Sequence, residues 1–278
     1  MRIALGVEYD GRAYSGWQYQ GHAPSVQQVA EAAVGRVAAA TVRLQCAGRT
    51  DAGVHATGQV AHFDTEARRS ARAWVLGTNV NLPADVSVRW ACEVDPGFHA
   101  RFSATGREYR YLILNRFSRD ALAAGRATWE CRPLDARRMH DAAQSLVGRH
   151  DFSAFRAAGC QAHTPVRNVT FLEVSRSGAL ITLRVRADAF LQHMVRNIAG
   201  VLIRIGAGLA PVHWAREVLD GRDRRLGAVT APPDGLYLTR VFYPGHFGLP
   251  ADGEGFAPEV MVGPVAGTTA DSGGRSAQ

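Results

Sequence analysis

The sequence contains no lysine, so the 32 residues of its lysine-plus-arginine total are all arginines. Without a lysine amine the chain cannot form a Schiff base, hold pyridoxal phosphate or carry the lysine of a phosphate-binding loop, and those enzyme classes are excluded. A genome bias toward GC-rich codons explains the absence as well as function does. The cations that remain are planar guanidinium groups, which suit phosphates and stacked bases.

Cysteine is also scarce, and its spacing argues against a metal site. The four cysteines stand at positions 46, 92, 131 and 160. They never form a close pair, so neither a zinc site nor a disulfide framework is indicated. The ten histidines are equally scattered, and none forms a helical pair at metal-ligand spacing. We therefore expect no metal and no cofactor.

No apolar run is long enough to cross a membrane. The most apolar stretch, residues 198–209, is interrupted by Arg204 and is too short for a bilayer. Glu8 and Asp10 come too early for a secretory signal. We expect a cytoplasmic protein that has no membrane partner.

The overall composition is that of a soluble globular protein, with 46% hydrophobic and 21% charged residues in a length of 278. Such a chain can bury a substantial core, in one large domain or two smaller ones. The formal net charge of +7 favours a polyanionic partner. Two arginine groups could contact phosphates, although each could equally be an ordinary solvated surface. They are Arg68, Arg69 and Arg72, and Arg222, Arg224 and Arg225.

Hydrophobic periodicity predicts two similar halves, each close to a ferredoxin-like unit. In the first half we expect strands at 3–9, 42–46, 58–63 and 86–94, with helices that begin after Ser25 and Ser70. The second of these helices is expected to reach residue 76. In the second half we expect strands at 107–114, 166–175, 180–187 and 236–242, with helices at 135–147, 190–205 and 211–219.

The predicted fold class is therefore α+β, with mainly antiparallel sheets in two lobes, residues 1–104 and 105–248, and an active-site cleft between them. Residues 249–278 are rich in glycine, alanine, proline, serine and threonine and contain few large apolar side chains. We expect that tail to be disordered.

One short stretch, residues 46–55, is composed like a functional loop. It places a single acid, Asp51, between Gly48 and Gly53. Glycine can take backbone angles closed to other residues, so the chain can turn sharply on both sides of the carboxylate. Composition alone would favour a plain turn in which Asp51 bonds its own backbone. The flanking sequence is needed to distinguish a functional loop from a plain turn.

Residues 48–55, Gly-Arg-Thr-Asp-Ala-Gly-Val-His, followed by Gln-Val-Ala-His-Phe at 59–63, resemble the catalytic motif of the tRNA pseudouridine synthase A family. Other motifs of that family follow in the same order: Tyr-Asp-Gly at 9–11, Gly-Trp-Gln at 16–18, Asn-Leu-Pro at 81–83, Phe-His-Ala-Arg-Phe-Ser-Ala at 98–104, Arg-Glu-Tyr-Arg-Tyr at 107–111 and His-Met-Val-Arg-Asn at 193–197. So many ordered motifs make a chance match very unlikely. The resemblance implies the pseudouridine synthase fold.

The resemblance also implies roles for the matching residues. Asp51 would attack the ribose C1′ carbon or act as a base at the sugar. Arg196 would keep the Asp51 carboxylate ionised, since a carboxylate shielded from water tends to take up a proton. Tyr109 would stack on the flipped base, and Arg49 would enter the RNA and displace that base from its stack.

Four further residues are candidates for substrate binding by the same resemblance. Leu236 corresponds to an apolar pocket residue, and Gln18, His99 and Arg101 fit either RNA contacts or structural roles. The residues alone are also compatible with purely structural roles. Arg196 could lie on a solvated helix face, and Tyr109 and Leu236 could be ordinary core packing.

If the resemblance holds, the chain is an isomerase that acts on uridines at positions 38, 39 and 40 in the tRNA anticodon stem-loop, as a homodimer. Two alternatives remain. A non-catalytic RNA-binding module of similar fold would leave the uridines unchanged. A nucleoside hydrolase would release free uracil, but such enzymes typically use a second carboxylate or a metal, and no companion acid is evident near Asp51.

Overall fold

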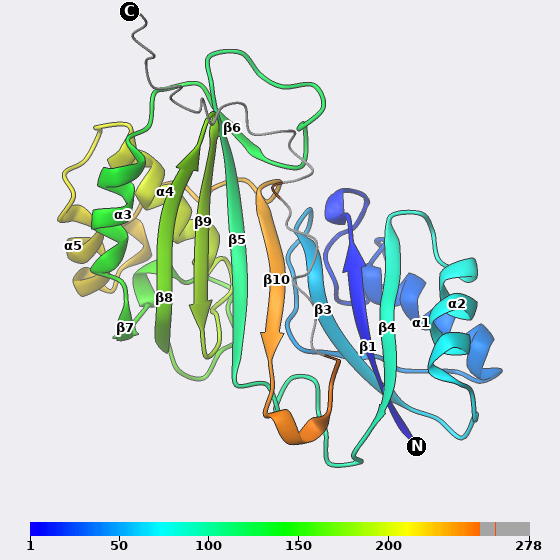
Figure 1. Cartoon of the computed structure of the whole chain (residues 1–278). Coiled ribbons are helices and arrows are strands. Elements are labelled where there is room, and N and C mark those ends of the chain that lie inside the picture. Colours follow the sequence, from blue (N-terminus) through cyan, green and yellow to red (C-terminus); the bar gives the residue numbers. More distant parts are fainter. Residues whose placement is uncertain (251–258, 260–278) are drawn as a thin grey trace, which may run out of the picture.

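The computed structural model describes residues 1–250 and residue 259, and one ten-stranded sheet runs through it (Figure 1). The tail predicted at 249–278 lies almost entirely outside the described residues. Strands of the first half are β1 (Arg2–Tyr9), β2 (Gln45–Cys46), β3 (His55–Asp64) and β4 (Val86–Val94). Its helices are α1 (Val26–Ala38) and α2 (Ala71–Asn81).

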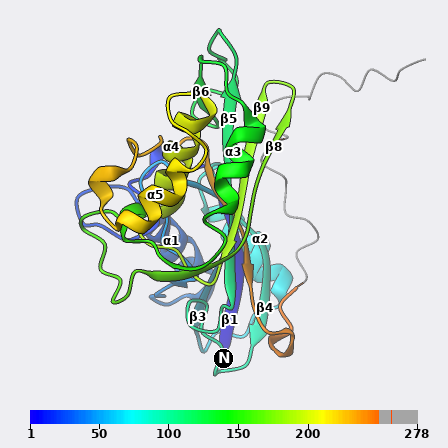
Figure 2. The same cartoon turned by 90° about the vertical axis from the view of Figure 1, so that its left-hand side faces the viewer.

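The second half supplies the other strands and three α-helices. The strands are β5 (Gly106–Asn115), β6 (Thr128–Glu130), β7 (Gly148–Asp151), β8 (Val166–Ser177), β9 (Leu180–Ala187) and β10 (Leu236–Phe242). The helices are α3 (Ala136–Gln144), α4 (Met194–Gly206) and α5 (Trp214–Gly221). Figure 2 shows these helices gathered on one face of the sheet beside β8 and β9. The α+β class with mainly antiparallel strands is confirmed.

The two halves share this sheet because β10 joins them. The strand order is β4-β1-β3-β10-β5-β9-β8-β7, and β10 runs parallel to β3 but antiparallel to β5. On one side Tyr237 pairs with His55, and on the other Leu238 pairs with Tyr109. The start of β3, which directly follows the Asp51 loop, therefore lies two strands from Tyr109. The lobe boundaries at 104 and 248 remain predictions.

Serine caps open both helices of the first half, as their sequence predicts. The Ser25 hydroxyl accepts a hydrogen bond from the Gln28 amide at 3.3 Å, and Ser70 accepts one from Ala73 at 3.2 Å. An N-cap of this kind satisfies an amide that has no partner within the helix. Helix α2 continues to Asn81, five residues beyond the expected end at 76.

Elsewhere the observed elements differ from the expected ones for local reasons. The strand expected at 42–46 is reduced to Gln45–Cys46, because side chains of α1 bond the backbone of Leu44: the Glu31 carboxylate accepts from its amide, and the Gln27 side chain donates to its carbonyl. Helix α4 begins at Met194 rather than at 190, since His193 has a left-handed backbone with φ of 62°.

Two short strands, β6 and β7, were not predicted. Helix α3 ends at Gln144 instead of 147, and α5 begins at Trp214 instead of 211. None of the helices in the described part of the chain has the length and apolar character that a bilayer span requires.

Candidate active site

The loop that carries Asp51 is fixed by hydrogen bonds from the neighbouring strands. The side-chain amide of Gln59, on β3, donates to the Gly48 carbonyl at 2.6 Å. The Tyr9 hydroxyl, at the end of β1, lies 2.8 Å from the Thr50 hydroxyl, and this contact is buried. These bonds leave the loop little freedom on the side that precedes Asp51.

Glycines shape the loop that carries Asp51 and allow a neighbouring segment to pack against it. The chain bends at Ala47 and Gly48 before Asp51 and turns at Ala52 and Gly53 after it. Of the two flanking glycines only Gly53 has a positive φ, of 78°, so only the turn after the acid uses the backbone angles that favour glycine. Gly16 has a φ of 95°, and a Cβ there would lie 2.5 Å from the Thr50 carbonyl oxygen. Only glycine lets the segment around residue 16 pack against the loop backbone.

Arg196 reaches Asp51 from the second half of the chain. Its Nη1 atom lies 3.6 Å from Asp51 Oδ2, and the two side chains are 14% and 27% exposed. The Arg196 Nε atom donates to the Ala231 carbonyl at 2.8 Å, and the Ala231 amide donates back to the Arg196 carbonyl at 3.2 Å. The guanidinium is therefore held at one end and directed to the carboxylate at the other. An adjacent cation favours the ionised form of a carboxylate.

His193 is a second neighbour of the carboxylate that the sequence did not identify. Its Nε2 atom lies 3.5 Å from Asp51 Oδ2. The residue belongs to the motif at 193–197, one helical turn before Arg196, but the helix expected from residue 190 gave no reason to single it out. Its left-handed backbone marks the true start of α4 and turns the side chain toward Asp51.

Tyr109 is buried close to the loop. It is 8% exposed, and its ring meets that of Phe190 edge-on with centroids 5.0 Å apart. A Cβ on Gly48 would lie 3.7 Å from the Tyr109 hydroxyl. Burial raises the pKa of this hydroxyl above its usual value; Arg107 opposes the rise and Asp51 adds to it. Tyr109 therefore stays neutral near pH 7, which suits an aromatic surface rather than a base.

The other predicted site residues fall into different surroundings. Leu236 is buried and pairs with Tyr111 across β10 and β5, two residues along β5 from Tyr109. Arg49 and Gln18 are exposed, and within the described residues neither has a hydrogen bond or ion pair. The Arg49 side chain, two residues before Asp51 in the loop, therefore has a guanidinium group without a partner among the described residues.

His99 and Arg101 lie in a cluster next to the loop. The His99 ring meets the Gln45 side chain at 2.7 Å through Nε2 and accepts from the Arg101 amide at 3.1 Å through Nδ1, so both ring nitrogens are engaged. Arg107, which the sequence did not single out, is buried and connects this cluster to the loop. Its Nη2 atom donates to the carbonyls of Arg101 and Ala47 at 2.7 and 2.9 Å.

No group of three or more histidine, cysteine, aspartate or glutamate side chains suited to a metal ion occurs among the described residues. A cavity of about 470 Å³ lies at the far end of α4, lined by residues that include Arg204, Trp214 and Leu226. It contains neither Asp51 nor Arg196, so it belongs to a different surface.

Comparison with known proteins gives consistent matches. A family model described as tRNA pseudouridine synthase matches residues 6–103 and 142–244. Those ranges contain Asp51 and Arg196, whereas Tyr109 falls between them. The tRNA pseudouridine synthase A of Aeromonas hydrophila is 58% identical over 250 residues, 90% of this chain and 93% of the relative.

Two further relatives with the same name are similar to the same extent. That of Pseudomonas aeruginosa is 58% identical over 250 residues, 90% of this chain and 88% of the relative. That of Methylococcus capsulatus is 56% identical over 252 residues, 91% of this chain and 93% of the relative. Among solved structures, a Cbf5-Nop10-Gar1 complex matches 87% of this chain and 59% of that chain, at 11% identity and with a TM-score of 0.34. This structural similarity is too weak to add to the sequence matches.

Proposed function

The chain belongs to the tRNA pseudouridine synthase family, and we propose that it converts uridines at positions 38, 39 and 40 of the tRNA anticodon stem-loop to pseudouridine with Asp51 as its catalytic residue. The enzyme is an isomerase. In the reaction the N1–C1′ bond of uridine breaks and a C5–C1′ bond forms; C5 loses a proton and N1 gains one. No oxidant, reductant or energy source is consumed.

The contact between Asp51 and Arg196 carries this proposal. An ionised carboxylate can attack C1′, or remove a proton from the sugar, while uracil departs as a stabilised anion. Both routes fail if the carboxylate is protonated. The Arg196 guanidinium, 3.6 Å away and itself mostly buried, supplies the positive charge that favours the ionised form. His193 Nε2 adds a second polar group at the same oxygen.

The family resemblance suggests the remaining roles, and position and burial support them. We assign the flipped uracil to the Tyr109 ring, which is buried beside the loop and has no charge near pH 7. Leu236, on the adjoining strand, would line the apolar side of that pocket. Arg49, exposed and unpaired within the described residues, would fill the space that the base leaves in the RNA. Gln18, also exposed, would contact the RNA nearby.

We further propose that the enzyme acts as a homodimer in the cytoplasm, where its tRNA substrate is found. Sedimentation velocity at micromolar concentration would report the dimer directly. A monomer at that concentration would contradict this part of the proposal and leave the chemistry untouched.

Mapping of pseudouridine in tRNA treated with the wild-type protein and with Asp51→Ala tests the function. We expect the wild-type protein to modify positions 38, 39 and 40, and the variant to bind the same tRNA without modifying it. Pseudouridine formation by Asp51→Ala at the wild-type rate would refute the assignment of Asp51. Free uracil as the product of the wild-type protein would point to a hydrolase instead.

A further inference from the structure

A short segment between β4 and β5 presents an aromatic ring to solvent close to the catalytic loop. Phe102 is 75% exposed. Its ring centroid lies 4.3 Å from that of His99, and the guanidinium carbon of Arg101 lies 5.5 Å from it. We call these three residues the Phe102 platform. Exposed aromatic rings flanked by arginine are the surfaces on which proteins stack unpaired bases.

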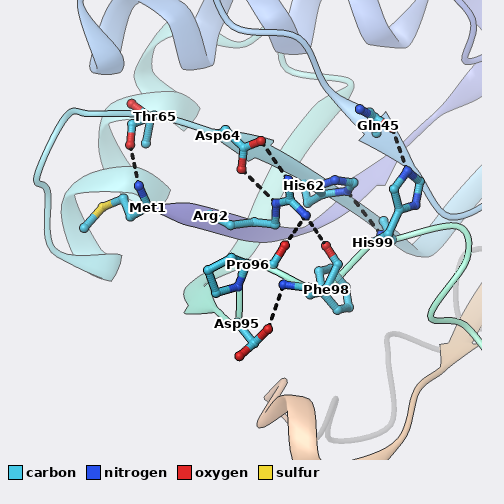
Figure 3. A network of polar contacts seen from close by, with 12 residues as sticks. Met1, Arg2, Gln45, His62, Asp64, Thr65, Asp95, Pro96, Phe98 and His99 are labelled. Carbon is cyan, nitrogen blue, oxygen red and sulfur yellow. Dashed lines mark hydrogen bonds and ion pairs between the residues drawn. The ribbon is translucent and has the colours of Figure 1, made fainter.

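The backbone before the platform is anchored to β1 and β3. Arg2 donates to the carbonyls of Pro96 and Phe98 at 2.5 and 2.7 Å and makes two bonds of 2.8 Å to Asp64 (Figure 3). The Phe98 side chain is fully buried. The same segment thus buries one phenylalanine and exposes the other, Phe102, so exposure of Phe102 is not a result of a loose chain.

The platform itself is anchored as firmly. Buried His62 accepts a hydrogen bond from the Ala100 amide at 3.2 Å, and the Tyr243 hydroxyl donates to the Ala100 carbonyl at 2.6 Å. Figure 3 shows the His99 ring directed at the Gln45 side chain. A surface fixed in this way has little conformational freedom left to lose on binding a ligand.

Two observations connect the platform to the catalytic loop. Arg107 bridges the carbonyls of Arg101 and Ala47, and Ala47 precedes Asp51 in the loop. In addition, burial raises the pKa of the Cys46 thiol to about 12, and both Arg49 and Arg101 oppose that rise. Both guanidinium groups are therefore within electrostatic reach of one thiol at the base of the loop.

Exposure alone does not make a binding site, and Phe117 provides the contrast. Phe117 is 91% exposed in the connection between β5 and β6, but within the described residues no ring or guanidinium packs against it. Phe102 differs because its neighbours hold the ring in place and supply a positive charge beside it.

We propose that the Phe102 platform stacks on one unpaired base of the tRNA, close to the nucleotide that enters at Asp51, while the exposed Arg101 guanidinium contacts the phosphate backbone of that strand. This inference rests on the proposed function, because it requires the RNA to lie across the Asp51 loop. The ligand is a base that stays outside the catalytic pocket, so the platform contributes to binding and to the choice of RNA rather than to the chemical step.

A binding cycle between protein and RNA variants tests this directly. The wild-type protein, Phe102→Ala and Phe102→Trp are titrated against an anticodon stem-loop and against copies of it that carry one abasic nucleotide at each loop position in turn. We expect Phe102→Ala to bind the intact RNA about 5- to 100-fold more weakly, and Phe102→Trp to bind it like the wild-type protein. At one abasic position, and only there, Phe102→Ala and the wild-type protein should bind equally.

Phe171→Ala is the matched control, because Phe171 also lies near a guanidinium, that of Arg184 at 5.2 Å, but on β8. We expect it to bind the intact RNA within about twofold of the wild-type protein. The proposal is overturned if Phe102→Ala binds that RNA as well as the wild-type protein does, if its loss is the same at every abasic position, or if Phe102→Ala changes the oligomeric state. Pseudouridine formation by the wild-type protein is measured in parallel, so that failure of the platform is distinguished from failure of the proposed function.

Discussion

At the scale of single residues, Arg196 matters because only part of its guanidinium is used by the fold. Nε is occupied by the Ala231 carbonyl, and Nη1 is left to face Asp51. We expect Arg196→Gln to lower the isomerisation rate at saturating tRNA about 100- to 1000-fold, the usual cost of losing one preorganised electrostatic partner. Single-turnover kinetics would measure this.

Arg204→Gln provides the control for that experiment. Arg204 lies in the last turn of the same helix and packs near Trp214 at 5.7 Å, away from Asp51. The isomerisation rate of Arg204→Gln should remain within about threefold of the wild-type rate. A similar reduction in both variants would mean that α4 needs the charges only for its stability.

His62 makes a separate prediction about pH. It is 2% exposed, and its Nδ1 atom accepts the Ala100 amide, a bond that requires the neutral ring. Burial, with smaller contributions from His99 and Arg2, lowers the pKa of His62 to about 4 from its usual 6.5. Between pH 6.5 and pH 4 the His62 ring is therefore protonated in the unfolded chain but neutral in the folded chain. The free energy of unfolding falls as the pH falls toward 4.

His62→Asn should make this loss of stability shallower, because the Asn side-chain oxygen can accept the same amide but does not titrate. Urea unfolding between pH 7 and pH 4.5 would measure the slope for both proteins. Equal slopes would show that groups other than His62 cause the acid sensitivity.

The sequence identified some residues of the candidate site and missed others for definite reasons. Asp51 and Arg196 belong to motifs that resemble those of a family, and the structure brings them together from the two halves. His193 was missed because periodicity cannot show that a helix starts with a left-handed residue. Arg107 was missed because a buried arginine that bridges two carbonyls has no signature in sequence spacing.

At the scale of elements, the junction between β3 and β10 depends on Gly58. A Cβ there would lie 2.1 Å from the Thr239 carbonyl oxygen, at the point where the register of β10 against β5 shifts. We expect Gly58→Ala to reduce the free energy of unfolding by about 1–3 kcal/mol, because either β10 or β3 must move to admit the methyl group.

Gly21→Ala is the control for that variant, since nothing lies within 4 Å of a Cβ at position 21. It should change the free energy of unfolding by less than about 0.5 kcal/mol. Denaturant titration of both variants gives the comparison. An unchanged free energy of unfolding for Gly58→Ala would show that the β3–β10 junction accommodates the added methyl group without cost.

Most of the longer strands were predictable from the sequence, whereas the short strands β6 and β7 and the partners of β10 were not. The pattern at 236–242 gave β10 with its observed bounds, because alternating apolar residues mark a strand whatever lies beside it. That β10 would run parallel to β3 and unite the halves follows only from tertiary contacts. The strand expected at 42–46 was shortened for the same kind of reason, since side chains of α1 bond its backbone.

At the scale of the whole molecule, the two arginine groups that looked alike in sequence are different in the structure. Arg225 pairs with Asp223 at 2.6 Å, and Arg224 bonds the side chains of Asn197 and Thr230. Arg68, Arg69 and Arg72 are exposed, and none of them has a carboxylate partner among the described residues. The group at 68–72 is therefore the better candidate for phosphate contacts.

Replacement of Arg68, Arg69 and Arg72 by glutamine should lower the salt dependence of tRNA binding. The slope of log affinity against log salt should decrease by about one for each phosphate that the variant no longer binds. Replacement of Arg222 and Arg225 by glutamine should change it less. Fluorescence titrations from 50 to 300 mM salt (about the range in which such slopes are resolved) would decide, and a larger change in the second variant would reverse the assignment.

The most direct test of the whole account is the single-turnover rate of pseudouridine formation by Asp51→Asn on prebound tRNA. Asparagine keeps the shape of the side chain and removes its charge. We predict binding within about threefold of the wild-type protein and a rate lower by at least about 10⁴-fold, as for the loss of a catalytic nucleophile. A variant that still isomerises uridine within about tenfold of the wild-type rate would contradict a role for the Asp51 carboxylate in the chemistry.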